Sequence, residues 1–379
     1  MKNEKTIICH SFPAWDTPYV KSTVELMTRL TGEFRVIFVD YHYTLKDLFN
    51  NPYAPKKQIR GLRSRWRKVA MPQGDIEIFN TTPILPINWI KNKTLFKWMA
   101  KLNGLILKRQ IKRLVKKNQL ENSILVNAFN PIYGTETLSA WQSRKSFYYC
   151  YDEISGTDWS GKHGTDFEKK FLQMVDEVIV TSPKLLNTKS KFNNNTKLVP
   201  NGVNLDIFQP KIGTPHSGSI GYVGAIDNRI DVELINKLSE KFPEKTFDFY
   251  GPLKLDKDIF TSPNIQFHGA IPQEQLPEKI SNMDVCLIPF IKNELTSAIY
   301  PLKANEYLAM GKPVVATNFA DLSDFENIIK IAKDHLAFEE AVEASLTIQE
   351  LGVQHDRTSF AQQNSWENRA SSFASHLVA

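Results

Sequence analysis

Short apolar runs alternate along this chain with longer segments in which apolar and polar residues are interleaved. The short runs are typical of strands covered on both faces of a sheet, and the interleaved segments have the spacing of amphipathic helices. In the first half we predict helices over residues 19–30, 93–117 and 165–175. The predicted strands there are residues 6–9, 35–40, 76–79, 123–127, 146–151, 177–181 and 197–199.

The same alternation continues in the second half. The predicted strands are residues 219–223, 246–250, 265–268, 285–288 and 313–317, and the predicted helices are residues 231–242, 273–282, 301–311 and 358–377. This rhythm predicts an α/β fold with two doubly wound parallel sheets. Residues 209–218 are rich in proline, glycine and polar side chains, so we place the boundary there, between domains 1–210 and 211–357.

One helix carries more chemistry than the others. Pro301 suits its first turn and Gly311 suits the position after its end. A helix that begins at the carboxyl edge of a parallel sheet offers free N–H groups and the positive end of its dipole to a phosphate. Glu306 lies inside this helix, where a carboxylate can accept hydrogen bonds from a ribose. On Glu306 alone, an ordinary solvated surface glutamate is the better interpretation.

Several segments resemble the GT-B glycosyltransferases, particularly the large family 4 group. They are Pro301-Leu302-Lys303, Glu306-Tyr307-Leu308-Ala309 and Gly311-Lys312-Pro313-Val314-Val315, preceded by Val199-Pro200-Asn201-Gly202-Val203-Asn204, Ile220-Gly221-Tyr222-Val223-Gly224 and Asp284-Val285-Cys286-Leu287-Ile288-Pro289. Together they cover roughly residues 177–320 in the expected order, while the N-terminal half matches only in layout. The resemblance implies two Rossmann-like domains facing across a cleft, the first binding acceptor and the second nucleotide sugar. It also implies that the C-terminal helix, residues 358–379, packs back on the first domain.

The resemblance also implies a donor site. Glu306 is expected to accept the ribose hydroxyls, and Arg229 and Lys303 are expected to bind the diphosphate and stabilise it as the leaving group. The alternative for Arg229 is a surface arginine paired with Asp227 or Asp231. The other expected donor-binding residues are Tyr300 and Ser297, as hydroxyl donors, and Gly224, Gly251 and Ile271 at strand ends.

The sequence departs from the family pattern at two positions. A second glutamate often lies eight positions before the ribose-binding one, where this chain has Ala298. The arginine that usually follows the strand-end glycine is replaced by Ala225. Both changes bear on sugar identity, stereochemistry and activity more than on nucleotide recognition.

The catalytic expectation follows from the family. A retaining transfer, which we favour, needs no dedicated base, because the departing phosphate can take the acceptor proton. An inverting transfer needs one, and Asp152 is our first choice, with a capping or loop carboxylate as its alternative interpretation. On the acceptor side, the loop after the first strand places His10, Trp15 and Asp16 as candidates.

Composition limits the class of protein. A chain of 379 residues with 42% hydrophobic residues suggests two domains. No window reaches the apolar length of a transmembrane helix and the N-terminus lacks the features of a signal peptide, which favours the cytoplasm. The three cysteines, Cys9, Cys150 and Cys286, have no paired spacing and are expected to be reduced thiols. We expect neither a cofactor nor a metal.

Positive charge is concentrated near the N-terminus. Residues 1–120 contain 23 basic and 8 acidic residues, a balance of +15, so the remainder carries −9 of the total +6. One basic window runs from Lys56 to Lys68 and another from Lys91 to Lys117, the second interleaved with apolar residues. We rank an anionic membrane surface first as the partner of these windows, ordinary solvated helices second, and nucleic acid well below both.

These observations predict a cytoplasmic glycosyltransferase, peripheral on the inner face of the membrane. It is expected to move a sugar from a nucleotide diphosphate sugar to a glycan or lipid-linked acceptor in cell-envelope polysaccharide biosynthesis. Two alternatives remain open. One is a nucleotide-sugar epimerase of the UDP-GlcNAc 2-epimerase type, and the other is a non-catalytic, membrane-associated relative that binds nucleotide sugar.

Overall fold

The computed structural model describes residues 5–17, 21–156, 161–210, 218–347 and 351–378. The chain forms two compact units, one of Met1–Pro200 with Ala370–Ala379 and the other of Asn201–Arg369. The division at Pro200 falls before the segment 209–218 in which we expected the boundary, and most of that segment lies outside the described residues.

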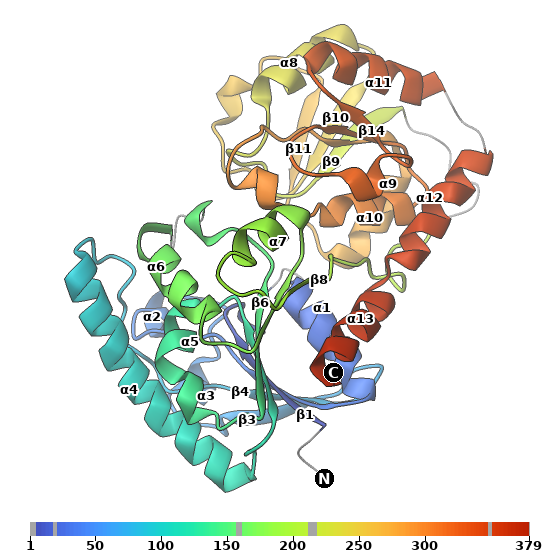
Figure 1. The fold of residues 1–379 in the computed structure, drawn as a ribbon. Coiled ribbons are helices and arrows are strands. Elements are labelled where there is room, and N and C mark those ends of the chain that lie inside the picture. Colours follow the sequence, from blue (N-terminus) through green and yellow to red (C-terminus); the bar gives the residue numbers. More distant parts are fainter. Residues whose placement is uncertain (1–4, 18–20, 157–160, 211–217, 348–350, 379) are drawn as a thin grey trace. The chain divides into compact units, whose positions relative to one another are not determined.

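The first unit is built on an eight-stranded sheet with the order β3-β4-β2-β1-β5-β6-β7-β8 (Figure 1). Neighbouring strands pair in parallel, except that β3 pairs with β4 in the antiparallel sense. The central strand β1 is buried at every position, as its apolar run predicts. The strands are β1 (Thr6–Ser11), β2 (Arg35–Val39), β3 (Trp66–Val69), β4 (Ile76–Phe79), β5 (Ile124–Ala128), β6 (Lys145–Cys150), β7 (Glu177–Val180) and β8 (Thr196–Leu198).

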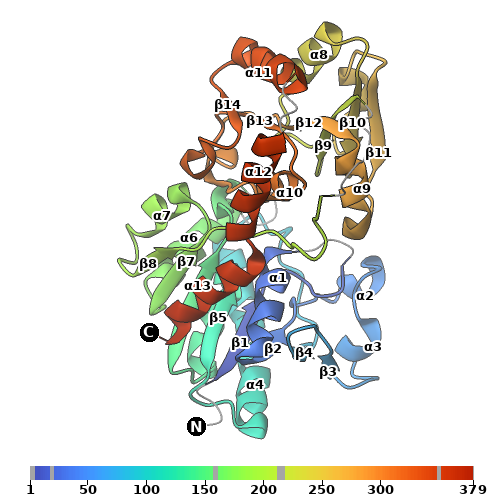
Figure 2. The ribbon, with the colours of Figure 1, turned by 90° about the vertical axis from the view of Figure 1, so that its right-hand side faces the viewer.

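Helices cover both faces of this sheet. In Figures 1 and 2, α4, α5 and α6 lie on one side of it and α1 on the other, next to the C-terminal end of α13 (Trp366–Val378). Phe373 of α13 packs on Tyr149 of β6, with ring centroids 5.5 Å apart. The remaining helix bounds are α1 (Ser22–Arg29), α2 (Asp47–Asn50), α3 (Lys56–Ile59), α4 (Lys93–Asn118), α5 (Pro131–Thr137), α6 (Gly161–Leu172) and α7 (Pro183–Lys189).

The second unit contains a parallel six-stranded sheet with the order β11-β10-β9-β12-β13-β14. In the figures α8 and α11 cover one face and α9 and α10 the other, and α12 packs against α10. The strands are β9 (Ser219–Val223), β10 (Thr246–Tyr250), β11 (Ile265–Gly269), β12 (Met283–Ile288), β13 (Val314–Thr317) and β14 (Lys330–Ala332). The helices are α8 (Val232–Lys241), α9 (Leu276–Ser281), α10 (Leu302–Ala309), α11 (His335–Thr347) and α12 (Leu351–Gln363).

The two parallel sheets confirm the predicted α/β architecture, and two local predictions were wrong. The final helix is not continuous but divides into α12 and α13. Val203 accounts for the break, because its N–H donates to the carbonyl of Asn364 and its carbonyl accepts from the N–H of Trp366. The antiparallel strand β3 was missed, because Trp66–Val69 reads in sequence as part of a basic window.

Candidate functional site

Helix α10 is tied to the end of β9. Pro301 directly precedes its first residue and Gly311, with φ of 72°, follows its end, so the two residues mark the helix ends as expected. The backbone N–H of Val223, the last residue of β9, donates a 2.8 Å hydrogen bond to the hydroxyl of Tyr307. The central strand and the helix that carries Glu306 are therefore held in a fixed relation.

Gly224 follows β9 in a conformation that suits only glycine, with φ of 147°. A Cβ atom there would lie 2.2 Å from Cε of Lys303 and 2.7 Å from the hydroxyl oxygen of Tyr222. The side chain of Lys303 thus lies directly against the backbone at the end of β9. This contact brings together two residues that the sequence assigned to the same site.

The neighbouring strands end in the same way. Gly251, after β10, has φ of 149°, and a Cβ atom on it would lie 1.9 Å from the carbonyl oxygen of Gly224. The N–H of Gly224 donates to Tyr250, and the N–H of Gly251 donates to Gly269, both at 2.8 Å. Ile271 follows two residues after Gly269 and is partly buried. The ends of β9 and β10 therefore contact each other through backbone atoms, with no side chain between them.

Glu306 is buried in the second turn of α10, with 6% of its surface exposed. Its charge acts on Lys303: burial lowers the pKa of Lys303, while Glu306 opposes this shift and Arg229 adds to it. One carboxylate and two cations are thus close enough to influence each other. An anion that approached Lys303 would favour its charged form.

Arg229 lies in the turn after β9 and pairs with Asp227. Its Nε and an Nη atom donate to the two carboxylate oxygens at 2.8 and 2.9 Å, and its guanidinium lies 5.5 Å from the ring centroid of Phe290. Burial alone would raise the pKa of Asp227, but its bonds with Arg229 lower it overall. The pairing is the one expected of a structural arginine, and the Arg229 charge also contributes to lowering the pKa of Lys303.

Two predicted hydroxyl donors are less well placed. Tyr300 is buried, with its ring 5.2 Å from that of Phe325 and its hydroxyl oxygen inaccessible to solvent. The Ser297 hydroxyl donates to the carbonyl oxygen of Asn293 within its own turn. Ala298, where a second glutamate was expected, is also completely buried.

Residues 218–347 match the family model described as "Glycosyl transferases group 1". This part of the second unit is therefore similar to group 1 glycosyl transferases. The Bacillus subtilis (strain 168) protein TuaH, whose name assigns it to teichuronic acid biosynthesis as a glycosyltransferase, is 25% identical over 176 residues. That alignment covers 42% of this chain and 44% of TuaH, less than half the length of either protein. These matches confirm the family resemblance.

Solved structures confirm the GT-B fold class. Sucrose-phosphate synthase from Thermosynechococcus elongatus matches with a TM-score of 0.70 and 16% identity, covering 98% of both chains. A glycosyltransferase from Rickettsia africae ESF-5 matches with 0.68 and 14%, over 98% of this chain and 97% of its own. An α,α-trehalose-phosphate synthase from Burkholderia vietnamiensis gives 0.68 and 9%, over 98% and 96%. At these identities the likeness shows the fold alone.

In the first unit, His10 is held inside the protein. It is completely buried at the end of β1, with Nε2 2.6 Å from Nε2 of His42 and Nδ1 3.3 Å from the amide nitrogen of Asn127. Burial, followed by the nearby His42, lowers its pKa. Both ring nitrogens are engaged away from solvent, so His10 does not present its ring to an acceptor in this structure.

Trp15 and Asp16 lie in the loop after β1 and are partly exposed. The N–H of Trp15 donates to Oδ1 of Asp40 at 2.7 Å, and Asp16 forms an ion pair with Arg67. Asp40, which sequence reasoning missed, also accepts hydrogen bonds from Tyr41 and Asn80. It holds the loop against the end of β2, and its place directly after an apolar run was the available signal.

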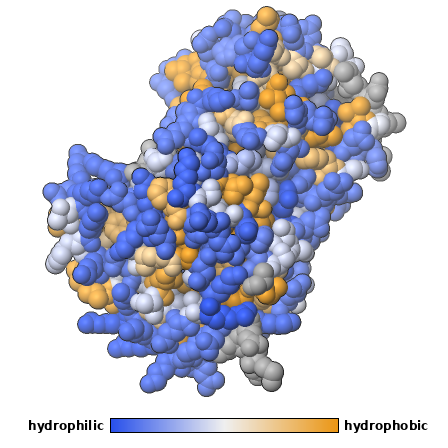
Figure 3. Space-filling view, in the orientation of Figure 1, coloured by the Kyte–Doolittle hydropathy of each residue, from blue (hydrophilic) through white to orange (hydrophobic). Residues whose placement is uncertain are grey.

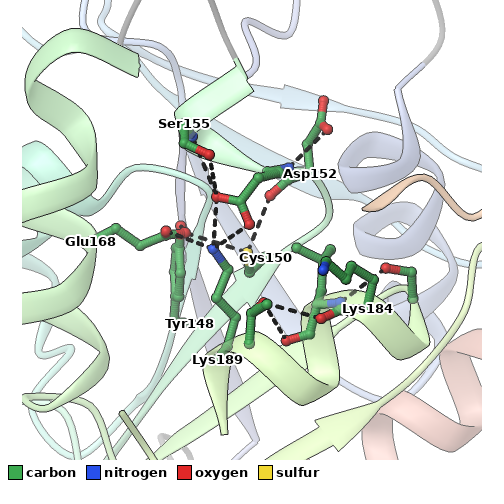
Figure 4. A network of polar contacts seen from close by, with 11 residues as sticks. Tyr148, Cys150, Asp152, Ser155, Glu168, Lys184 and Lys189 are labelled. Atoms are coloured by element: carbon green, nitrogen blue, oxygen red, sulfur yellow. Dashed lines mark hydrogen bonds and ion pairs between the residues drawn. The ribbon is translucent and has the colours of Figure 1, made fainter. Parts of the chain in front are cut away.

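Asp152, the candidate base, follows β6 beside a buried polar network (Figure 4). Its Oδ1 accepts the N–H of Glu153 at 2.9 Å, and its carbonyl oxygen accepts from Sγ of Cys150. Lys189 of α7 donates to Glu153 at 3.0 Å and to Glu168 of α6 at 2.8 Å, with little of the three side chains exposed. The network fixes the backbone that presents Asp152.

The second basic window forms one 26-residue helix, α4. Trp98, Leu95 and Leu105 lie on its exposed side among lysines and arginines, and Trp89 lies exposed just before the helix. In Figure 3 the side of the first unit that carries α4 shows small hydrophobic areas among hydrophilic residues. Trp66 of the other window is partly buried instead and donates to Glu77. Among the described helices, none is long and apolar enough to cross a membrane.

Proposed function

We propose that the protein is a hexosyltransferase-like enzyme that moves a sugar from a nucleotide diphosphate sugar, bound by the second unit, to a glycan or lipid-linked acceptor. The observation that carries the proposal is the contact of Lys303 with Gly224, with Glu306 one turn further along α10, inside the domain that matches group 1 glycosyl transferases. Glu306 would accept the ribose hydroxyls and Lys303 would bind the diphosphate.

The proposed chemistry depends on offsetting charge on the leaving diphosphate. Lys303, Arg229 and the N-terminus of α10 supply positive charge at one strand end, which supports a reaction without a metal. We favour retention of configuration, in which the departing phosphate takes the acceptor proton. In an inverting reaction, Asp152 would act as the general base that takes this proton.

A role in cell-envelope polysaccharide synthesis is supported by the similarity to TuaH. The exposed side of α4 supports peripheral binding to an anionic membrane, which would place the enzyme on the cytoplasmic face. Exposed tryptophan and leucine side chains can enter the headgroup layer while the surrounding basic residues bind anionic lipids.

The decisive experiment is a thermal-shift screen of the full chain with nucleoside diphosphates and their sugars, followed by turnover of the best ligand. A ligand that binds the folded state raises the melting temperature by mass action. Release of nucleoside diphosphate that requires an acceptor is the expected result. Epimerised donor formed without an acceptor, or binding without turnover, would overturn the transferase assignment.

A further inference from the structure

Two neighbouring hollows open at the carboxyl ends of β1, β2 and β6 in the first unit. The first, of about 590 Å³, is lined by the rings of Phe12, Tyr41 and Tyr151. The second, of about 370 Å³, has Tyr41 and Trp89 among its lining residues. Both volumes are within the range of small-molecule sites.

The wall that the two hollows share is polar. Tyr41, Asp47 and Asn51 line both. Oδ2 of Asp47 accepts two hydrogen bonds from Thr44, at 2.7 and 2.8 Å, whereas Oδ1 has no partner in the described part of the chain. Oδ1 of Asn51 accepts from the N–H of Tyr53 at 3.0 Å, which leaves its amide nitrogen available. The shared wall therefore offers a ligand one hydrogen-bond acceptor, Oδ1 of Asp47, and one donor, the amide nitrogen of Asn51.

The remaining walls combine aromatic residues with small and polar ones, including Lys21 in the first hollow and Lys46 in the second. Burial and the nearby Asp47 raise the pKa of Tyr41 to about 12, so its hydroxyl stays a donor at neutral pH. The indole Nε1 of Trp89 donates to the carbonyl oxygen of Pro86 at 3.0 Å, and 71% of the residue is exposed. This bond fixes the orientation of a large exposed ring beside the second hollow.

Rigid aromatic faces interrupted by an amide and a carboxylate suit a carbohydrate better than an alkyl chain. The C–H groups of a sugar ring can pack on the aromatic faces, and its hydroxyls can pair with unused donors and acceptors. An alkyl chain that crossed the shared wall would bury Asp47 and Asn51 without replacing their hydrogen bonds to water, which is costly.

We propose that the two hollows bind successive sugar units of one acceptor, the accepting sugar between Phe12 and Tyr151 and the next sugar between Tyr41 and Trp89. Asp47 and Asn51 would contact hydroxyls on both sides of the glycosidic link. This inference rests on the proposed transfer to an acceptor and gives that acceptor a class: a glycan of at least two units.

The test is an NMR titration of the full chain, without membranes, with methyl glycosides of glucose, galactose, N-acetylglucosamine, N-acetylgalactosamine and glucuronic acid and with their disaccharides. We expect a disaccharide to bind about fivefold more tightly than its monosaccharide, since a second aromatic contact adds about 1 kcal/mol. Trp89→Ala should remove this gain while keeping monosaccharide binding. Tyr41→Ala should weaken both, and Tyr41→Phe should show how much of that loss belongs to the hydroxyl.

Tyr53→Ala is the matched control, because Tyr53 is exposed in the same unit and lines neither hollow. The proposal is overturned if no sugar binds, if monosaccharides and disaccharides bind equally, or if Trp89→Ala changes nothing. Dodecyl maltoside that binds through its chain, with maltose inactive, would also overturn it. Calorimetry of the same samples with nucleoside diphosphates separates the two proposals: intact nucleotide binding with no sugar binding refutes only this one.

Discussion

Gly224 is a tightly constrained residue in the proposed donor site. Gly224→Ala would place a methyl group on Lys303 in a backbone conformation that disfavours side chains, so we expect a loss of about 1–3 kcal/mol of stability and weaker nucleotide binding. Thermal unfolding and calorimetry measure both. Gly352→Ala is the control, because a Cβ there meets nothing within 4 Å. Unchanged nucleotide affinity in Gly224→Ala would exclude Lys303 from the site.

Glu306 is the residue that we propose binds the ribose. Glu306→Ala should weaken nucleotide-sugar affinity about tenfold or more, because hydrogen bonds to a charged group contribute about 1.5–3 kcal/mol. Isothermal titration calorimetry measures the loss. Glu240→Ala, at an exposed position of α8, should leave the affinity unchanged. Equal affinities for Glu306→Ala and the parent would remove the site assignment.

Asp40, which binds the loop after β1, is expected to make the folding stability depend on pH. Burial raises its pKa from 3.8 to about 6, despite hydrogen bonds from Trp15 and Tyr41 that lower it. The folded state thus favours the protonated form, so Asp40 stabilises the fold below about pH 4, and this contribution of about 3 kcal/mol is lost as pH rises through 6. In urea titrations from pH 4 to 7, Asp40→Asn should remove this part of the pH dependence, and the exposed Asp206→Asn should retain it. An unchanged slope in Asp40→Asn would contradict the assignment.

At the scale of elements, α4 is the candidate for membrane contact. Replacing Lys108, Arg109, Lys112 and Arg113 by glutamine should reduce cosedimentation with phosphatidylserine vesicles, because each basic residue near an anionic surface contributes about 1 kcal/mol. The control replaces four exposed lysines of the second unit by glutamine, namely Lys254, Lys257, Lys292 and Lys330. Equal losses in both variants would mean that only total charge matters, and no loss in either would support ordinary solvated helices.

Elements also show what the sequence could and could not predict. Helix α10 was predictable because Pro301 and Gly311 mark its ends by local backbone chemistry. The division of α12 from α13 was not, because it depends on Val203, far away in the chain. The environment of His10 was unpredictable for the same reason. Its position at a strand end was predicted, but its burial against His42 depends on a residue distant in the chain. Local signals were reliable where the backbone itself sets the structure.

For the whole molecule, the location of the proposed positive charge in one unit leads to a test of metal dependence. All the positive charge proposed to offset the leaving diphosphate comes from the second unit, through Lys303, Arg229 and α10. Transfer by the full chain should therefore keep its rate, to within about twofold, in excess EDTA. Activity that falls on chelation and returns with Mg²⁺ would show that the protein cations are insufficient. A parallel measurement on a known metal-dependent transferase controls for the chelator.

The glycine-lined strand ends have a consequence for how this protein can change. Where Gly224 and Gly251 approach as bare main chain, no side chain is available to exchange, and any added one meets another backbone atom or Lys303. Selection for a new nucleotide sugar therefore has little room at these positions. A library for altered donor preference should leave both glycines fixed and vary Ala225, Pro252 and Ile271, which lie close to them in the sequence.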